Sequence, residues 1–207
     1  MAAELRLMIP TKETVEPDDR QLVETIRGGD PDAFEALVRR KTSKVYSLCY
    51  RIIGNSEDAK DISQLVFIKL WENLEKYDPQ YAFDTWLYRM VTNVAIDFMR
   101  NKQSRENAVN SNLRLVKTST DADQGTIVQR KEVESVFNTV SQALSPKQKT
   151  IFVMNQMEDL SSSEIAKVLG CRESTVRNHL FNARKLMQQQ LRKRFPEYSR
   201  LWKEEQQ

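Results

Sequence analysis

Hydrogen-bond donors gather near the C-terminus, within the stretch RESTVRNHLFNARK at residues 172–185. Arg172, Arg177 and Asn178 carry donors of the kind that read base edges in the major groove of DNA. Arg184 and Lys185 follow one to two turns later and suit contacts to phosphates. A duplex nucleic acid is therefore the ligand that this stretch predicts, with a solvated basic helix in an ordinary bundle as the alternative.

A second set of polar side chains recurs every three or four residues between positions 89 and 100: Arg89, Asn93, Asp97 and Arg100. On a helix this spacing places them on one side, apart from an apolar stripe that includes Leu87 and Val94. An aromatic cluster comes just before them. Its members are Tyr77, Tyr81, Phe83 and Trp86. Aromatic rings beside donors and arginines favour the capture of unstacked bases, although the rings could instead be core.

A third candidate surface lies in residues 56–77. The predicted core stripe of this segment is Ile62, Val66, Leu70 and Leu74, and two apolar residues lie outside it. Leu65 and Ile68 fall nearly opposite that stripe, together with the acids Asp61 and Glu72. An apolar pair among acids on a helix that already has a core face predicts a protein-docking surface. The alternative is a helix buried in the middle of its bundle, and the acids count against full burial.

The sequence offers no set of residues for catalysis or metal binding. His179 is the single histidine, and Cys49 and Cys171 are two cysteines without metal-ligand spacing. We therefore expect a protein that is not an enzyme, with no catalytic residues, no metal and no cofactor. Without a long apolar run or a signal segment, we also expect a cytoplasmic protein with no membrane insertion.

The elements that must position these residues are helices. Ser161 and Glu164 have the spacing of a capping box, and Gly170 is placed to end that helix in a left-handed conformation. A second helix then starts near Glu173 and runs to Arg194, before Pro196. Two helices joined so tightly predict a helix-turn-helix, in which one helix braces another that lies in DNA.

Glycine and proline are scarce, and no convincing stretch alternates apolar with polar residues, so the predicted fold class is all-α. We expect two helical domains joined by a flexible linker, the second containing the helix-turn-helix. The predicted helices before it cover residues 18–27, 31–54, 56–77 and 84–100, then 127–143 and one opened by Ser145-Pro146. The linker is residues 102–125, which are rich in Ser, Thr, Asn and Asp.

Five stretches together resemble the extracytoplasmic-function (ECF) sigma factors of the sigma-70 family of bacterial RNA polymerase. They read DAFEALVRR, NSEDAKDISQLVFIKLWENL, FDTWLYRMVTNVAIDFMR, LSPKQKTIFVM and LSSSEIAKVLGCRESTVRNHLFNARKLM, in that order between about residues 20 and 195. The resemblance implies a polar N-terminal tail (1–17), sigma region 2 (18–101), the linker (102–125) and sigma region 4 (126–207).

The resemblance also implies roles for the three surfaces. Region 2 would bind the clamp helices of the largest polymerase subunit, β′, through Asp58, Asp61, Gln64, Leu65, Ile68 and Glu72. It would melt and read the minus-10 promoter element through Tyr77, Tyr81, Phe83, Trp86, Arg89, Asn93, Asp97 and Arg100. Region 4 would read the minus-35 element through Arg172, Glu173, Ser174, Thr175, Arg177, Asn178, Phe181, Arg184 and Lys185, and meet the flap of the β subunit.

The implied partners are core RNA polymerase, promoter DNA and an anti-sigma factor, and the implied state of the free chain is a monomer. The linker would thread toward the RNA exit path, with the acidic stretch DADQ in it. Two positions depart from the family pattern, because Leu65 and Lys60 stand where acids are common. Binding to the polymerase would then depend more on apolar contact, with Asp61 as the principal acid.

Two other classes of protein stay open at this point. A helix-turn-helix regulator that dimerises through its N-terminal half would bind a palindrome, but it leaves the aromatic stretch YDPQYAFDTW without a role. An inactive relative that only sequesters a partner would bind protein and not a promoter.

Overall fold

The computed structural model describes residues 17–110, 126–196 and 198 of the 207-residue chain. The predicted tail (1–17), except for its last residue, and the predicted acidic stretch DADQ lie outside these residues. The described residues are helical almost throughout, with no strand among them, which confirms the all-α prediction. Two compact units are distinguished, Met1–Arg40 and Lys41–Gln207.

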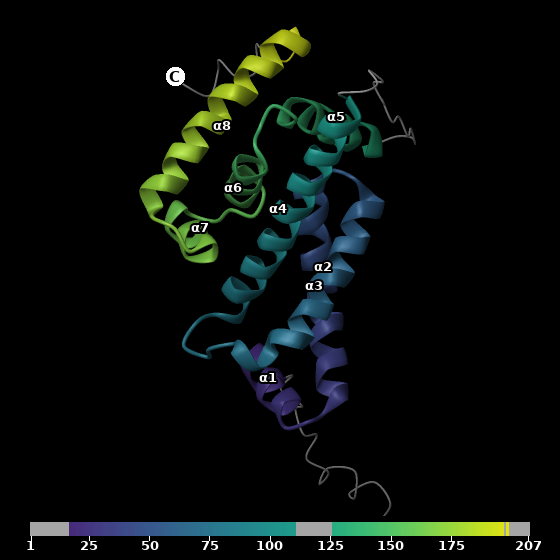
Figure 1. The fold of residues 1–207 in the computed structure, drawn as a ribbon, viewed down its shortest axis with the longest axis vertical. Helices are drawn as coiled ribbons and strands as arrows, with labels where there is room; N and C mark the ends of the chain where they lie inside the picture. The colour runs from purple at the N-terminus through teal and green to yellow at the C-terminus, as the bar shows by residue number, and fades with distance from the viewer. Residues whose placement is uncertain (1–16, 111–125, 197, 199–207) are drawn as a thin grey trace, which may run out of the picture. The chain divides into compact units, whose positions relative to one another are not determined.

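Figure 1 shows the helices in chain order. They are α1 (Asp19–Arg27), α2 (Pro31–Ile53), α3 (Ser56–Asn73), α4 (Phe83–Asn110), α5 (Thr126–Ser141), α6 (Pro146–Gln156), α7 (Ser162–Leu169) and α8 (Glu173–Arg194). A short 3-10 helix, η2 (Leu74–Lys76), extends α3.

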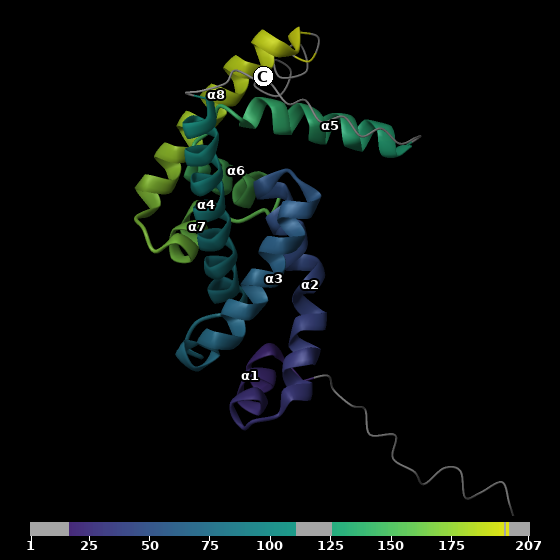
Figure 2. The same ribbon diagram turned by 45° about the vertical axis from the view of Figure 1, so that its right-hand side comes forward.

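Within the second unit, α4 is the central helix. It packs against α3 on one side and against α6 and α7 on another, and both views of the ribbon agree with this (Figures 1 and 2). Helix α8 packs against α5, α6 and α7. A core cluster under α8 includes Val140, Leu144, Phe152, Ala183 and Met187. The helix that carries the C-terminal candidate residues is thus held in place by three others.

The predicted helix-turn-helix forms as expected. Ser161 accepts a hydrogen bond from the backbone N–H of Glu164, and Glu164 accepts one from the backbone N–H of Ser161, which completes the capping box. Gly170 ends α7 with φ of 61°, in the left-handed region that disfavours residues with a Cβ. Ile165 and Val176 are fully buried between the two helices. The sequence prediction for this motif is confirmed.

Some predicted helix ends differ from the structure. The helix predicted to end at Arg100 continues to Asn110, because residues 101–110 contain no glycine or proline to stop it. The same helix begins at Phe83, one residue before its predicted start at Asp84. The helix predicted over residues 56–77 begins at Ser56 as expected, with the side chain of Asn55 accepting from the N–H of Asp58 as its cap, but it ends at Asn73 and η2 continues only to Lys76.

Among the described residues no helix is long and apolar enough to cross a membrane. In the same residues no group of three or more His, Cys, Asp or Glu side chains could hold a metal ion.

Candidate nucleic-acid interface

Helix α8 presents a basic, solvent-facing surface directly after the left-handed turn. Arg172, Arg177, Asn178, Arg184 and Lys185 are all exposed. The opposite side of the helix, including Val176, Leu180, Ala183 and Met187, is buried. The core therefore fixes the rotation of α8 about its own axis, and this rotation turns the predicted DNA-contacting residues outward.

Three features affect the properties of this surface. Glu173 accepts hydrogen bonds from Nε and Nη2 of Arg177 at 3.1 and 2.6 Å, so the guanidinium is held along the helix one turn from its N-terminus. Phe181 is 68% exposed, which is unusual for a large apolar ring and leaves it open to contact. Burial and nearby Lys147 lower the pKa of His179 below its ordinary value.

The remaining predicted residues of this set differ in their exposure to solvent. Ser174 is exposed, whereas Thr175 and Glu173 are partly buried. Arg184 also donates to the side-chain oxygen of Asn155, at 3.1 Å, which ties α8 to α6.

The polar side of α4 lies where the sequence placed it. Arg89, Asn93, Asp97 and Arg100 are exposed, while Leu87 and Val91 are fully buried. The helix start is anchored by Asp84, which forms salt bridges with Lys41 at 2.7 Å and with Lys44 at 2.8 Å. Burial raises the pKa of Asp84, but the hydrogen bonds from the two lysines outweigh it and leave the pKa below its ordinary value.

The aromatic cluster before α4 is divided between core and surface. Tyr77 and Phe83 are only 3% and 4% exposed and pack edge to face, with ring centres 5.4 Å apart. Both were predicted to contact DNA, and in this structure their rings are enclosed by neighbouring side chains. Trp86 is partly buried against both rings, and Tyr81 is 64% exposed. Only Tyr81 offers an open face.

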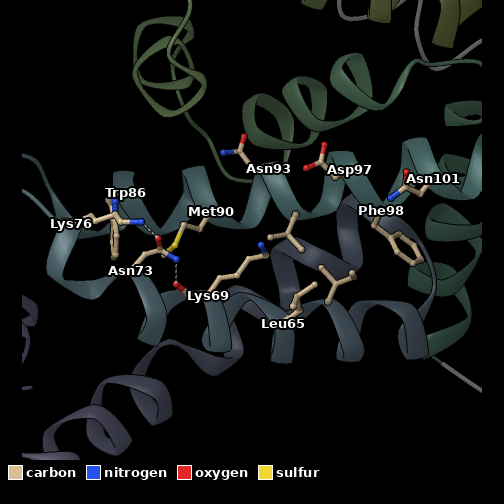
Figure 3. Close-up of a pocket in the computed structure, with 12 residues that line it drawn as sticks. Leu65, Lys69, Asn73, Lys76, Trp86, Met90, Asn93, Asp97, Phe98 and Asn101 are labelled. Atoms are coloured by element: carbon tan, nitrogen blue, oxygen red, sulfur yellow. Dashed lines mark hydrogen bonds between the residues drawn. The ribbon is translucent and has the colours of Figure 1, made fainter.

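A groove of about 500 Å³ runs between α3 and α4 (Figure 3). From α4 it is lined by residues that include Trp86, Met90, Asn93 and Asp97, and from α3 by residues that include Leu65. Asn93 and Asp97 were predicted to contact DNA and Leu65 to contact protein, so the two predicted surfaces meet along a single groove.

Sequence reasoning missed two cations of this groove, Lys69 and Lys76. Asn73 connects to both, since Lys76 donates to its side-chain oxygen and its amide donates to the backbone carbonyl of Lys69, each at 2.8 Å (Figure 3). Lys69 follows Leu65 by four residues on α3, and that spacing could have indicated that the two share a face.

Most of the residues predicted to form the docking surface lie on the exposed face of α3. Leu65 is 39% exposed and Ile68 55%, and Asp61, Gln64 and Glu72 are exposed as well. The predicted core stripe on the other side, Ile62, Val66, Leu70 and Leu74, is buried. Asp58 differs from the rest, because it is salt-bridged to Lys102 of α4 at 2.7 Å. Trp71, 54% exposed, extends the apolar face beyond the residues that the sequence indicated.

Comparison with known families assigns both halves of the chain. The family model for sigma-70 region 2 matches residues 37–105, and the model for sigma-70 region 4 matches residues 137–187. The ECF RNA polymerase sigma factor SigW of Bacillus subtilis is 32% identical over 180 residues, which cover 84% of this chain and 96% of that protein. The chain belongs to the ECF RNA polymerase sigma factors.

Other comparisons with this ECF sigma factor agree. The ECF sigma-E factor of Haemophilus influenzae is 30% identical over 181 residues, 84% of this chain and 95% of that protein. Two solved structures share the fold, CnrH in complex with the cytosolic domain of CnrY and the sigma factor RpoE in complex with the anti-sigma factor NepR from Bartonella quintana. Their TM-scores are 0.60 and 0.59, at 22% and 18% identity, covering 85% and 77% of this chain and 98% and 96% of theirs.

Proposed function

We propose that this ECF sigma factor binds core RNA polymerase, recognises the minus-35 and minus-10 elements of its promoters, promotes melting and so initiates transcription of a specific set of genes. It would do so without a catalytic step of its own. The observation that carries the proposal is the presence of two separate exposed polar faces, on α4 and α8, in a chain whose halves match sigma regions 2 and 4.

We assign minus-35 reading to the exposed side of α8. Arg177 would reach a base edge while Glu173 holds its guanidinium in place, and Phe181 would contact the apolar part of a base. Arg184 and Lys185, later on the helix, would hold phosphates. The other predicted members, Arg172, Ser174, Thr175 and Asn178, begin the same surface.

We assign minus-10 reading to the exposed polar side of α4 and to Tyr81. A base that has left the stack would lie against the open ring of Tyr81 or the partly exposed Trp86, near the amide of Asn93. The buried rings of Tyr77 and Phe83 would act beneath this surface as its support. Arg89, Asp97 and Arg100 would complete the contacts along the helix.

We assign polymerase binding to the exposed face of α3, with Leu65 and Ile68 as its apolar centre and Asp61, Gln64 and Glu72 around them. The occupant would be the clamp helices of the β′ subunit, and region 4 would meet the β flap. We propose that region 2 covers residues 18–101, that residues 102–125 are a linker and that region 4 covers residues 126–207.

The remaining partners and the location follow from the same proposal. The two solved structures named above contain sigma factors bound to other proteins, NepR being an anti-sigma factor, and we propose an anti-sigma partner for this chain too. The free protein would be monomeric and cytoplasmic.

The decisive experiment is multi-round transcription on a library of genomic fragments with bacterial core polymerase, with and without this protein. Defined start sites that appear only when the protein is added would support the proposal, and aligning them would give both promoter elements. Core polymerase that stays silent while the protein binds duplex DNA as a dimer would replace it with an ordinary helix-turn-helix regulator.

A further inference from the structure

Arg177 and Arg184, two arginines on the exposed side of α8, are held in different ways. Arg177 donates to the carboxylate of Glu173 on the same helix, at 2.6 Å, so a negative charge lies beside its positive one. Arg184 donates from Nη2 to the side-chain oxygen of Asn155 on α6, at 3.1 Å. No carboxylate among the described residues forms a salt bridge with Arg184. Its guanidinium is therefore placed by a neutral group and keeps its full charge.

The amide of Asn155 is itself fixed on both sides. Its nitrogen donates to the backbone carbonyl of Leu160 at 2.9 Å, and its oxygen also accepts from the side chain of Gln156 at 2.6 Å. A carbonyl only accepts and a guanidinium only donates, so the amide nitrogen must face Leu160 and the amide oxygen must face Arg184. Asn155 is partly buried near the C-terminal end of α6. One side chain thus connects α6, the turn between α6 and α7, and the middle of α8.

The turn that Asn155 holds leads directly into the helix-turn-helix. The backbone N–H of Leu160 donates to the carbonyl of Met154 at 3.0 Å, and the next residue, Ser161, is the N-cap of α7. Arg184 follows Arg177 by seven residues on α8, which at 1.5 Å per residue is about 10 Å along the helix axis. The contact with Asn155 therefore sets where this second guanidinium lies relative to the helix-turn-helix.

An amide and a carboxylate have different consequences for a phosphate contact. A carboxylate beside a guanidinium competes with a phosphate for the same N–H donors and lowers the charge offered to DNA. An amide occupies one donor and leaves the others, with the charge, to the phosphate. We propose that Asn155 is a positioning residue, which directs the guanidinium of Arg184 toward a backbone phosphate of the minus-35 element without neutralising it.

This inference rests on the proposed function, in which Arg184 holds a phosphate. Its physical consequence is preorganisation: an arginine side chain that is already ordered in the unbound protein loses less conformational freedom when the complex forms. Asn155 would then raise the affinity for DNA without touching DNA, and its whole contribution would pass through Arg184.

A double-mutant cycle on the full chain bound to core polymerase tests this dependence. The probe is a fluorescent duplex that carries the minus-35 element, and its affinity is measured over a series of KCl concentrations. We expect Asn155→Ala to weaken binding roughly threefold. Arg184→Ala should weaken it roughly fivefold to tenfold at about 0.1 M salt and reduce the slope of log affinity against log salt by about 0.9. The double variant should bind no more weakly than Arg184→Ala alone. Losses that multiply in the double variant would overturn the proposal, since Asn155 would then act on the fold of the turn.

Asn155→Asp tests why the positioning group is neutral. Aspartate keeps the size of the side chain and an oxygen toward Arg184, but its charge pairs with the guanidinium. We expect this variant to reduce the salt slope by up to about 0.9, whereas Asn155→Ala leaves the slope unchanged. Gln156→Glu is the matched control, because it adds the same charge at an exposed neighbour that has no hydrogen bond to Arg184, and its slope should match that of wild type. Equal slopes for Asn155→Asp and Gln156→Glu would overturn the proposal.

The same measurements separate this inference from the proposed function. If Arg184→Ala binds the duplex as tightly as wild type does, Arg184 holds no phosphate, and that assignment on α8 fails together with the role of Asn155. If Arg184→Ala weakens binding and the two Asn155 variants do not, only the positioning role of Asn155 fails. Transcription by the wild type from defined start sites, run in parallel, reports on the proposed function alone.

Discussion

Tyr77 donates a hydrogen bond from its buried hydroxyl to the backbone carbonyl of Tyr81, 2.7 Å away. Tyr77 begins the loop between η2 and α4, and Tyr81 lies near its end, so a ring in the core fixes the position of a ring at the surface. Tyr81 can therefore meet a nucleic acid with little loss of loop freedom on binding.

Tyr81→Ala tests the exposed ring directly. Since stacking of a base on an aromatic ring contributes about 1–3 kcal/mol, we expect polymerase carrying this variant to bind a single-stranded minus-10 oligonucleotide roughly tenfold more weakly. Fluorescence anisotropy measures the affinity for this oligonucleotide. Tyr77→Phe, which keeps the buried ring and loses only the hydrogen bond, should have a smaller effect. Equal affinity of Tyr81→Ala and wild type would exclude stacking on this ring.

Arg177→Ala tests base reading by α8. If Arg177 contacts a base edge, the variant should lose about 1–3 kcal/mol of binding free energy on its own minus-35 element and discriminate less among sequences. Binding of the polymerase complex to duplexes substituted one position at a time provides the measurement. Lys185→Ala serves as the comparison, because a phosphate contact should weaken every duplex alike. Uniform losses for Arg177→Ala would reassign it to the phosphates.

Leu65→Glu tests the docking face of α3. The Leu65 side chain is 39% exposed and belongs to the surface that we assign to polymerase. A carboxylate at this position would lose its hydration on binding, which costs binding free energy. We expect at least a tenfold loss of affinity for core polymerase with the helical circular dichroism spectrum unchanged. The buried neighbour Val66 supplies the contrast, since Val66→Glu should unfold the helices. Collapse of the fold in Leu65→Glu would make Leu65 a core residue.

The local signals in the sequence predicted the helix-turn-helix well, because its determinants are contiguous. The capping box at Ser161, the left-handed turn at Gly170 and the apolar positions of both helices lie within 20 residues. The end of α4 was missed for the opposite reason. Ser, Asn and Gln after Arg100 lower helix propensity only slightly, and the helix gains a tertiary anchor from the salt bridge between Lys102 and Asp58, which are 44 positions apart.

The aromatic cluster shows where pattern reasoning stops. Tyr77 and Phe83 have the same side-chain chemistry as Tyr81, and spacing alone does not tell which ring the fold encloses. The salt bridges of Lys41 and Lys44 with Asp84 and the groove between α3 and α4 likewise depend on how distant helices pack. The side chains of a site could be predicted by type, whereas their exposure required the fold.

Lys149 gives a prediction about pH. It is partly buried on α6, with its ammonium 5.8 Å from the ring centre of Phe137. Burial, with Lys102 adding repulsion, lowers the pKa of Lys149 from 10.5 to about 8. The unfolded chain therefore holds this proton more tightly than the folded protein does. Its contribution to the free energy of unfolding should rise between pH 8 and pH 10.5 and be least favourable below pH 8.

Lys149→Met removes the titrating group and keeps the length of the side chain. We expect the variant to be more stable than wild type by about 1 kcal/mol at pH 7, with the difference shrinking toward pH 10 as the wild-type ammonium loses its proton. Urea unfolding of both proteins at each pH provides the measurement. The difference between their free energies of unfolding at one pH cancels the contributions of the other lysines and of the tyrosines, which titrate in both proteins. Lys147→Met, two residues earlier on the same helix, is the control and should show no such trend. A stability difference between Lys149→Met and wild type that does not change with pH would mean that the ammonium of Lys149 is solvated in the folded protein.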